Sequence, residues 1–468
     1  MNQIKSASSY HTFERWGHPY YPLRLRCGTP AEGSPKTLGP DANPPTSRNG
    51  SRGHTLKLGI DFGTTNSAVA VLEEGQPRIV ELYPGERVQR TVIHCLPGGV
   101  PSFGNAAFRA YLECDLSGRF LRSIKAFLAH DVPKTTLGRQ RYTFPELIAA
   151  YLRFLITRAE EVLEQKVTHV VLGRPVHFHA DPARDAAAAA RLEEAVATLG
   201  ISCSMQLEPV AAACLYERSL TEERTVLVGD FGGGTADFAI FRAGPGLAKA
   251  EDRRPHILGT SGVAQAGDAL DGRFMQAFLM PYFGEGAVYK KRYSDEMVPF
   301  GHHIQTQIQR LYYVHHLRSN ELERWLEYME PRVNDWTVVR RIQRLIFDDL
   351  GYPMAWAIEQ TKRAFSDSAS TSFTFDEFYS ESLDIHTQVD RATFAHHSQS
   401  LLTLYDQAID EVLQTAVLKP KEIDDVFLTG GTSQLPFIGN LFLSRFGSSK
   451  QRNGDSFTSV CEGLVLTR

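Results

Sequence analysis

The sequence contains no long block of charge of one sign, and its formal net charge is only -4 over 468 residues. Proteins bind nucleic acids and anionic membranes through clustered cations, so neither is an expected partner. The apolar runs are shorter than the ~20 residues that a membrane-spanning helix needs, and residues 1–16 lack the apolar core of a secretory signal. These absences favour a cytoplasmic protein.

Cysteine is also scarce. The six cysteines are Cys27, Cys95, Cys114, Cys203, Cys214 and Cys461. Their spacing contains no CxxC pair, which argues against a disulfide framework and against a zinc site. Buried free thiols in a reducing cytosol are the favoured interpretation.

The composition that is present, 42% hydrophobic and 22% charged residues, is typical of a soluble globular protein. The length allows two to four domains. Residues 28–53 differ from the rest because proline, glycine, serine, threonine and asparagine dominate them. Such a segment buries too little apolar area to offset its ordering entropy. We therefore expect residues 1–54 to be a disordered or loosely packed N-terminal extension.

Two glycine-rich turns have the same form: an apolar strand, Asp-Phe-Gly, a small polar turn and a second apolar strand. The first turn begins at Asp61 and the second at Asp230. A unit of this kind occurring twice suggests two similar halves that face each other, with the active site between them.

Strands alternate with helices along the first half of the chain, which predicts an α/β sheet domain. The expected strands there are 77–82, 91–96, 168–172 and 201–207, and the expected helices are 106–129 in part, 144–163, 183–199 and 210–218. In the second half we expect a strand at 256–261, a helical insertion at 273–365, a strand pair at 373–375 and 383–386, a helix at 393–415, a strand at 426–429 and a helix at 436–446.

The glycine turns suit phosphate. Gly63 and Gly232, Gly233 and Gly234 allow positive φ and remove side chains from the approach, and successive amides in such a turn bind anions. Thr64, Thr65 and Thr235 add hydroxyl donors. The alternative is that the glycines only make two tight β-hairpin turns. Because the unit is repeated, and a third glycine turn follows at Gly430 and Gly431, phosphate binding is favoured.

Asp61 and Asp230 precede the turns at the ends of strands. Carboxylates there would repel bare phosphate, so we expect them to hold Mg²⁺ through its water molecules. The GxxxxGK[ST] phosphate loop is absent, and no HRD catalytic loop precedes the Asp-Phe-Gly at Asp61, which excludes a protein kinase.

Six segments resemble signatures of the DnaK-type heat shock protein 70 family, within the actin-like ATPase superfamily. Residues 59–67 and 229–237 resemble its two phosphate signatures. Residues 208–213, 266–271, 359–366 and 428–436 are similar to its NEPTAAA, GGEDFD, ExxKRxLS and LVGGSTRIP segments. The resemblance runs from about residue 56 to the C-terminus, in the order of the family.

The resemblance implies an α/β actin-like ATPase fold, with two duplicated ribonuclease H-like lobes around a nucleotide cleft. Lobe I would be residues 55–224, and lobe II would be residues 225–468 with the helical insertion. No hydrophobic linker or β-sandwich follows Gly463, so the chain resembles a bacterial, chaperone-like subgroup that lacks the peptide-binding domain.

The resemblance also implies roles for individual residues, with ATP and Mg²⁺ as the ligands. Lys125 would position the γ-phosphate and the attacking water, Glu208 would complete that network, and Asp230, Asp237 and Thr235 would be catalytic. Positioning and charge neutralisation are most of what phosphoryl transfer needs. The implied nucleotide-binding residues are Asp61, Gly63, Thr64, Thr65, Asn66, Gly232, Gly233, Gly234, Thr235, Gly267, Asp268, Glu359, Lys362, Arg363, Ser366, Gly430, Gly431, Thr432 and Gln434.

Two residues depart from the family pattern. Gln434 stands where the family has an arginine that helps to enclose adenine, and Asn66 replaces an aromatic residue beside the phosphates. Both substitutions are expected to change how tightly the nucleotide binds and which nucleotide is preferred.

Three functions fit the sequence. The leading one is a Mg²⁺-dependent, ATP-hydrolysing chaperone or chaperone-related protein. The second is a nucleotide-dependent switch that binds a protein partner through the helical insertion, although the favoured interpretation of its aromatic residues is that they form core. The third is a small-molecule kinase of the same superfamily, which lacks an evident sugar-kinase signature here.

Overall fold

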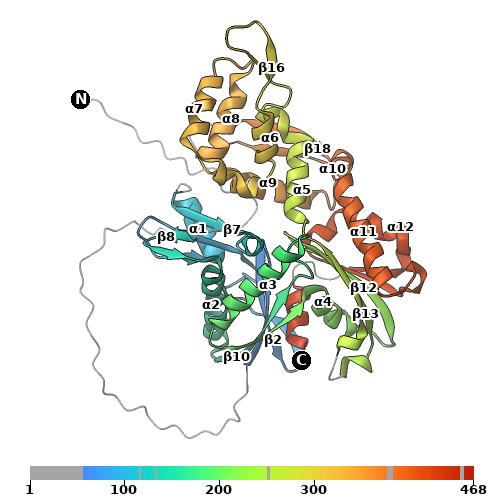
Figure 1. Cartoon of the computed structure of the whole chain (residues 1–468). Coiled ribbons are helices and arrows are strands. Elements are labelled where there is room, and N and C mark those ends of the chain that lie inside the picture. Colours follow the sequence, from blue (N-terminus) through green and yellow to red (C-terminus); the bar gives the residue numbers. More distant parts are fainter. Residues whose placement is uncertain are drawn as a thin grey trace, which may run out of the picture. The chain divides into compact units, whose positions relative to one another are not determined.

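The computed structural model describes residues 56–114, 117–131, 134–249, 253–376, 383–453 and 458–467. The predicted N-terminal extension, residues 1–54, lies outside this part of the chain. The described residues form a mixed α/β structure that contains two large sheets (Figure 1).

The first sheet is centred on a strand that ends in the first glycine turn. Its strands are β1 (Leu56–Phe62), β2 (Asn66–Glu73), β3 (Gln76–Ile79), β4 (Gln89–Arg90), β10 (Val167–Arg174) and β11 (Ser202–Leu207). β1 pairs antiparallel with β2, which pairs antiparallel with β3. On its other side β1 pairs parallel with β10, which pairs parallel with β11.

The second sheet repeats this arrangement around the second glycine turn. Its strands are β12 (Arg224–Phe231), β13 (Ala236–Ala243), β14 (Ile257–Val263), β19 (Asp425–Thr429) and β20 (Gln451–Asn453). β12 is antiparallel to β13, which is antiparallel to β14, and on its other side β12 is parallel to β19, which is parallel to β20. The two sheets therefore share one topology, as two duplicated halves require.

The helices of the first half follow from local signals in the sequence. They are α1 (Gly104–Glu113), α2 (Phe144–Leu163), α3 (Pro182–Ala197) and α4 (Glu208–Glu217). α2 begins with a capping box between Thr143 and Glu146, and its stripe of Leu147, Tyr151 and Leu155 is buried. The Asp181 carboxylate caps α3 by accepting a hydrogen bond from the Arg184 N–H at 3.0 Å.

Short strands fill the region between β4 and α2. They are β5 (Val92–Cys95), β6 (Ser102–Phe103), β7 (Arg119–Arg122), β8 (Thr135–Leu137) and β9 (Gln140–Tyr142). The helix expected within 106–129 thus ends at Glu113, and the segment returns as β7 because its residues pair with β5. The strand expected at 77–82 is also shorter, since β3 ends at Ile79.

The second half adds a group of helices that Figure 1 shows at one end of the described region. They are α5 (Gly267–Phe274), α6 (His302–Ile308), α7 (Asn320–Met329), α8 (Trp336–Phe347) and α9 (Gly351–Ala364). A 3₁₀ helix, η7 (Leu311–Leu317), connects α6 to α7. The segment predicted to be helical also contains a hairpin of β15 (Val288–Lys290) and β16 (Met297–Pro299).

The end of the chain returns to the second sheet. Its elements are the strand pair β17 (Ser370–Phe375) and β18 (Ile385–Asp390), then α10 (Arg391–His397), α11 (Gln399–Thr415), the 3₁₀ turn η9 (Gly431–Gln434), α12 (Pro436–Phe446) and α13 (Ser459–Leu466). The helix expected at 393–415 is therefore two helices. They divide at Ser398, whose hydroxyl donates to the Phe394 carbonyl at 2.8 Å.

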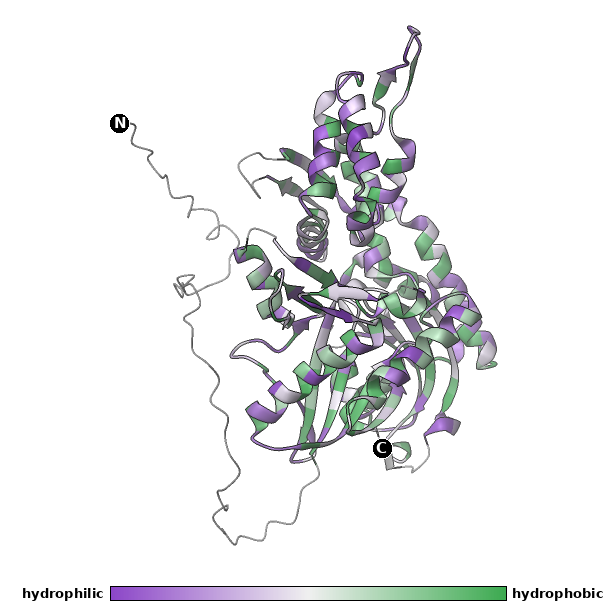
Figure 2. Ribbon diagram, turned by 60° about the vertical axis from the view of Figure 1, so that its left-hand side comes forward, coloured by the Kyte–Doolittle hydropathy of each residue, from purple (hydrophilic) through white to green (hydrophobic). Residues whose placement is uncertain are grey.

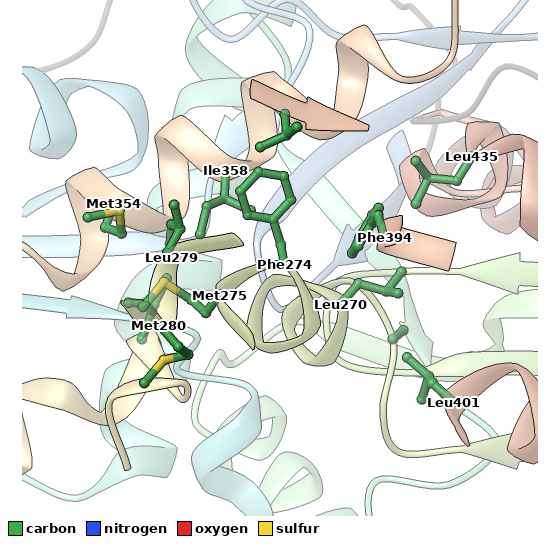
Figure 3. Close-up of a cluster of buried hydrophobic side chains, with 14 of the residues drawn as sticks. Leu270, Phe274, Met275, Leu279, Met280, Met354, Ile358, Phe394, Leu401 and Leu435 are labelled. Atoms are coloured by element: carbon green, nitrogen blue, oxygen red, sulfur yellow. The ribbon is translucent and has the colours of Figure 1, made fainter. Parts of the chain in front are cut away.

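Hydrophobic residues concentrate along the strands and on the inner sides of the helices (Figure 2). Figure 3 shows how α5 joins the helical group to the rest of the second half. Leu270 and Phe274 of α5 pack with Ile358 of α9, Phe394 of α10 and Leu401 of α11 in one buried cluster. The helical group therefore shares its core with the second sheet.

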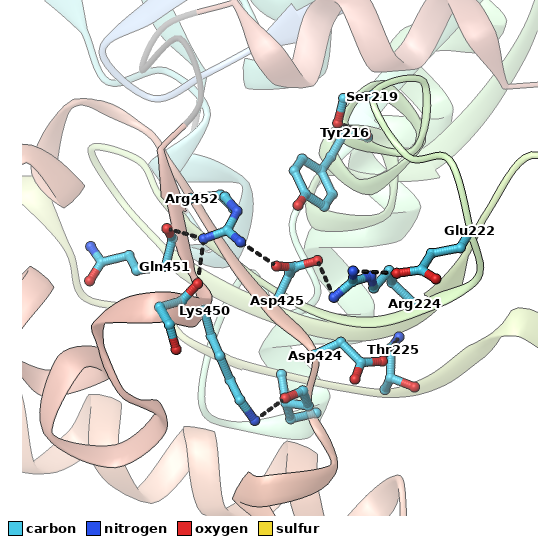
Figure 4. Close-up of polar contacts among 12 residues, drawn as sticks. Tyr216, Ser219, Glu222, Arg224, Thr225, Asp424, Asp425, Lys450, Gln451 and Arg452 are labelled. Atoms are coloured by element: carbon cyan, nitrogen blue, oxygen red, sulfur yellow. Dashed lines mark hydrogen bonds and ion pairs between the residues drawn. The ribbon is translucent and has the colours of Figure 1, made fainter.

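The edge of the second sheet is held by ion pairs around one buried carboxylate, Asp425 (Figure 4). Its Oδ1 lies 3.2 Å from Arg452 Nη2, and its Oδ2 lies 3.9 Å from Arg224 Nη1. Arg224 is on β12, Asp425 is on β19 and Arg452 is on β20. These pairs connect the three parallel strands that lead to the site.

Two helices lie between the sheets. Val210 and Ala211 of α4 and Leu464 of α13 pack in a core that also contains residues from both sheets, such as Val171 and Val226. No helix in the part of the chain that the structure describes is long and apolar enough to cross a membrane.

The contact of α13 with α4 yields a test of the fold. A Cβ atom on Gly463 would lie 1.8 Å from the Ala211 carbonyl oxygen, which is backbone and cannot turn aside. Gly463→Ala should therefore lower the free energy of unfolding by about 3 kcal/mol or more, measured by chemical denaturation. The matched control is Gly439→Ala in α12, where the nearest atom is 3.5 Å away and belongs to a side chain. It should be neutral or stabilise by up to ~1 kcal/mol.

Candidate functional site

The two glycine turns face each other. A Cβ atom on Gly233 would lie 2.2 Å from Thr65 Oγ1, and one on Gly234 would lie 2.6 Å from Thr64 Oγ1. Counted from Asp61 and Asp230, Thr64 corresponds to Gly233 and Thr65 to Gly234. The two contacts are therefore exchanged by a local two-fold symmetry, as in an isologous interface.

This contact explains the composition of the turns. The threonine side chains of the first turn fill the space that the second turn leaves empty because it has glycines. In the first turn, Gly63 is needed for another reason: its Cβ would lie 2.3 Å from the carbonyl oxygen of Asn66. Because the turns touch, a phosphate group between them requires them to move apart.

The strand register makes the two halves unequal at one position. Asp61 is opposite Ala68 across the first hairpin, whereas Asp230 is opposite Asp237 across the second. The second half therefore contributes two carboxylates where the first contributes one. Asp237 is held in place because its Oδ1 accepts the Val176 N–H at 2.6 Å.

Lys125 supplies the positive charge. It follows β7 and starts a short 3₁₀ turn, and its Nζ donates to Glu208 Oε1 at 2.6 Å. Both side chains are almost fully buried, 6% and 9% exposed. Glu208 is the first residue of α4, where the helix N-terminus favours a carboxylate.

The carboxylates at this site repel one another. Burial and the Glu208 charge raise the pKa of Asp61 to about 7, although Lys125 lowers it. Burial and Glu208 likewise raise the pKa of Asp237 to about 7. Burial, with the charges of Glu208, Asp61 and Asp237, raises the pKa of Asp230 well above its usual value. The structure thus brings together Asp61, Lys125, Glu208, Asp230 and Asp237, with one cation among four carboxylates.

The donor set at this site fits Mg²⁺. It consists of hard carboxylate oxygens, and Asp237 Oδ2 is buried with no hydrogen-bond partner among the described residues. No three His, Cys, Asp or Glu side chains within those residues are placed to hold a metal ion directly.

A second group of predicted residues contacts the backbone of the second glycine turn, mainly through hydrogen bonds to its carbonyl groups. The Gly267 N–H donates to the Gly232 carbonyl at 3.1 Å, and the Asp268 N–H donates to the Gly233 carbonyl at 2.8 Å. The Thr432 hydroxyl lies 3.4 Å from the Gly232 carbonyl. Gly430 has φ +83°, and a Cβ there would lie 2.2 Å from the Phe231 carbonyl oxygen. Thr235 closes the turn through its carbonyl, which accepts the Gly232 N–H at 3.0 Å.

The remaining predicted residues lie on α9 and η9. Lys362 donates to the Gly267 carbonyl at 3.1 Å and pairs with the Asp271 carboxylate. Glu359 accepts from Arg363 at 2.6 Å and lies 4.0 Å from Arg90 of the first half. Of the last three predicted positions, Ser366 is just beyond α9, whereas Gly431 and Gln434 are the first and last residues of η9, and Gln434 is exposed.

Sequence reasoning missed several polar residues beside this site. Arg90, Arg122, Tyr312 and Tyr352 come from four separate segments, and none belongs to a recognisable motif. Arg122 is buried and lies three residues before Lys125. Such residues are found only when the fold brings their segments together.

A surface groove of about 610 Å³ lies elsewhere, beside the edge strand β11. Its lining includes Arg174 and Glu193 with apolar residues of α3 and β11, such as Val196 and Met205. None of the predicted site residues lines this groove, so it does not mark the site between the turns.

Comparison with protein-family models adds a finding independent of this geometry. The family described as Hsp70 protein matches residues 128–277 and 353–463, which are more than half of the chain. The matched residues include Glu208, the second glycine turn and most of α9, whereas the first turn and Lys125 precede them. The predicted actin-like α/β ATPase fold, with its two duplicated halves, is confirmed.

The carboxylate of Asp268 gives a test by pH. Burial and the neighbouring Asp271 raise its pKa to about 7. A raised pKa in the folded state means that stability is lost as the pH rises from about 4 through 7. Asp268→Asn should remove this loss. The unfolding free energy of the variant, relative to that of wild type, should therefore be about 1–2 kcal/mol higher at pH 8 than at pH 5.

Chemical denaturation in the presence of a metal chelator measures this difference. The control is Asp295→Asn on the exposed hairpin, where the side chain is 98% exposed. If the difference in unfolding free energy between Asp268→Asn and wild type is the same at pH 5 as at pH 8, the pKa of Asp268 is not raised.

Proposed function

This chain belongs to the Hsp70 protein family, and from that premise we propose that it binds ATP with Mg²⁺ and hydrolyses the γ-phosphate between its two glycine turns. The observation that carries the proposal is the gathering of Lys125, Glu208 and three aspartates where the turns meet. The family is one of ATP-binding, chaperone-type ATPases. Residues 55–224 and 225–468 would form the two lobes around the nucleotide, in the cytoplasm.

Each group has a role that follows from its position. The backbone N–H groups of the two turns and the threonine hydroxyls would bind the phosphate oxygens. Lys125 would hold the γ-phosphate, with Glu208 orienting its ammonium group. Asp237 Oδ2 would accept a hydrogen bond from the attacking water and then its proton.

Mg²⁺ would supply charge neutralisation for the phosphates, held through water by Asp61 and Asp230. The ion would also offset the charge of the four carboxylates around one lysine. The energetic requirement of phosphoryl transfer is mostly positioning and electrostatic stabilisation, and these residues provide both. The support residues behind the second turn, Gly267, Lys362 and Gly430, would face the nucleoside end.

The direct test is ATP hydrolysis by the purified chain. Lys125→Ala and Asp230→Asn should each lower kcat about 100-fold or more, because each removes a charge from the reacting centre. Phosphate release measures the rate, and chelation of Mg²⁺ should abolish it. The control is Lys291→Ala, whose side chain is half exposed on the hairpin.

The same assay separates hydrolysis from a kinase reaction, since hydrolysis yields phosphate without a phosphorylated acceptor. Thermal unfolding identifies any variant that is not folded, which matters for Lys125→Ala because it leaves Glu208 buried without its partner. Equal rates in wild type and both folded variants would contradict the catalytic roles.

A second candidate function is a nucleotide-dependent switch that holds a protein partner on the helical insertion. The exposed aromatic residues of the insertion include two on its helices, Trp336 at 49% and Tyr328 at 39%. An arginine covers each ring: Arg340 at 4.4 Å from the centre of Trp336, and Arg332 at 3.7 Å from that of Tyr328. Exposed aromatic and arginine side chains are enriched where proteins bind one another.

This candidate is tested by co-purification with and without ATP. A partner of the insertion should be retained in a nucleotide-dependent way and lost in Trp336→Ala. The control is Val100→Ser, which changes an apolar residue of the first half that is even more exposed, at 88%. A set of bound proteins that is indifferent to nucleotide and to Trp336 would argue against the switch.

A further inference from the structure

Arg122 is a buried cation on which the carboxylates of Asp349 and Asp268 act only from beyond ion-pair distance. It ends β7, three residues before Lys125, and its side chain is 8% exposed in the described structure. Among the described residues no carboxylate oxygen lies within 4.0 Å of its guanidinium group, and Nη1 has no hydrogen-bond partner. A buried charge of this kind requires compensation from its surroundings.

The compensation comes from the second half of the chain. Arg122 Nη2 donates to the carbonyl of Leu311, and its guanidinium carbon lies 4.3 Å from the centre of the Tyr312 ring. The ring of Tyr352, at the start of α9, is 5.1 Å away. Cation–π contact with these rings stabilises the guanidinium in a place that water does not reach.

Tyr312 also contacts the support of the second glycine turn. Its hydroxyl donates to Asp271 Oδ2 at 2.6 Å. Asp271 pairs with Lys362, which donates to the Gly267 carbonyl at 3.1 Å. The Gly267 N–H in turn donates to the Gly232 carbonyl at 3.1 Å. A continuous set of polar contacts therefore connects Tyr312 to the second glycine turn.

The neighbouring residue of η7 reaches the other side of Lys125. The ring centre of Tyr313 lies 6.0 Å from that of Phe127. Lys125 is thus flanked by Arg122 and Phe127, and these rest on consecutive residues of η7. The segment between them is tight: Ser123 has φ +49°, and the Ala126 N–H donates to the Ser123 carbonyl at 2.8 Å. A shift of Arg122 must therefore move Lys125.

We propose that Tyr312 is a positioning residue for ATP hydrolysis, which aligns Lys125 through Arg122 with the second glycine turn through Asp271. This inference rests on the proposed function of the site. It assigns the helical insertion, from which η7 comes, a part in the reaction that is separate from any binding of a partner. Tyr312 itself touches neither turn, so its effect on the reaction is indirect.

The experiment compares steady-state ATP hydrolysis by two Tyr312 variants of the full chain. Tyr312→Phe keeps the ring over Arg122 and removes the hydroxyl, which donates to Asp271 and also hydrogen-bonds with Asp268, so kcat should fall roughly threefold to tenfold. Tyr312→Leu also removes the ring, and kcat should fall further, while KM for ATP changes less than kcat in both. Tyr142→Phe on β9 is the matched control and should retain the wild-type kcat, because it removes a comparable hydrogen bond, to Gln140 at 2.9 Å, on the exposed surface.

A double-mutant cycle identifies the route through Arg122. If Tyr312 acts through Arg122, the effects of Tyr312→Leu and Arg122→Leu on kcat should be clearly less than multiplicative. Arg122→Lys should restore part of the activity that Arg122→Leu loses, because it restores the charge. Thermal unfolding of every variant shows that the folded protein is being compared.

The outcomes separate the inference from the function on which it rests. If the wild-type chain neither binds nor hydrolyses ATP, the proposed function is wrong and the inference fails with it. If the wild-type chain hydrolyses ATP and both Tyr312→Phe and Tyr312→Leu match Tyr142→Phe, only the inference is overturned. Fully multiplicative effects of Arg122→Leu and Tyr312→Leu would also overturn it, since the two residues would then act independently.

Discussion

The structure depends on an excess of negative charge held between two touching turns. Four carboxylates, from Asp61, Glu208, Asp230 and Asp237, share one lysine, and the pKa of each of the three aspartates is raised. Burying like charges without compensation is costly. Perturbed carboxylates of this kind cluster at functional sites. The ligand that we propose for these groups is a hydrated divalent cation with a nucleotide phosphate.

The duplicated topology explains how this charge is brought together. A strand that runs into a turn places the residue before the turn at the end of the sheet, and two copies facing each other place Asp61 and Asp230 side by side. Symmetry alone would give two equal sites. The difference between Ala68 and Asp237 at corresponding positions makes the second half carry the additional carboxylate, while Lys125 comes from the first half. The second half therefore supplies the additional carboxylate, and the first half supplies the lysine.

Much of this could be predicted from the sequence because the information was local. The repeated Asp-Phe-Gly turns, the capped helix α2 and the bounds of α12 follow from short-range patterns. The divided helix at Ser398 and the return of the chain at β7 could not be predicted, since tertiary pairing decides them. The contact of Thr64 and Thr65 with the glycines of the second turn was not visible either, because it requires knowing how the two halves face each other.

The buried Arg122 shows why residues outside motifs matter for such a site. Its burial beside the site cannot be predicted from the local sequence, because the groups that stabilise it are far away along the chain. They are Leu311, Tyr312 and Tyr352. In the fold, η7 covers Arg122 and Phe127 together, and the segment between these residues carries Lys125. A helical insertion that only displayed a surface would need no such contact with the first half. Because η7 packs on the segment that bears the lysine, the proposed role of Tyr312 would make the geometry of the site depend on the position of the insertion.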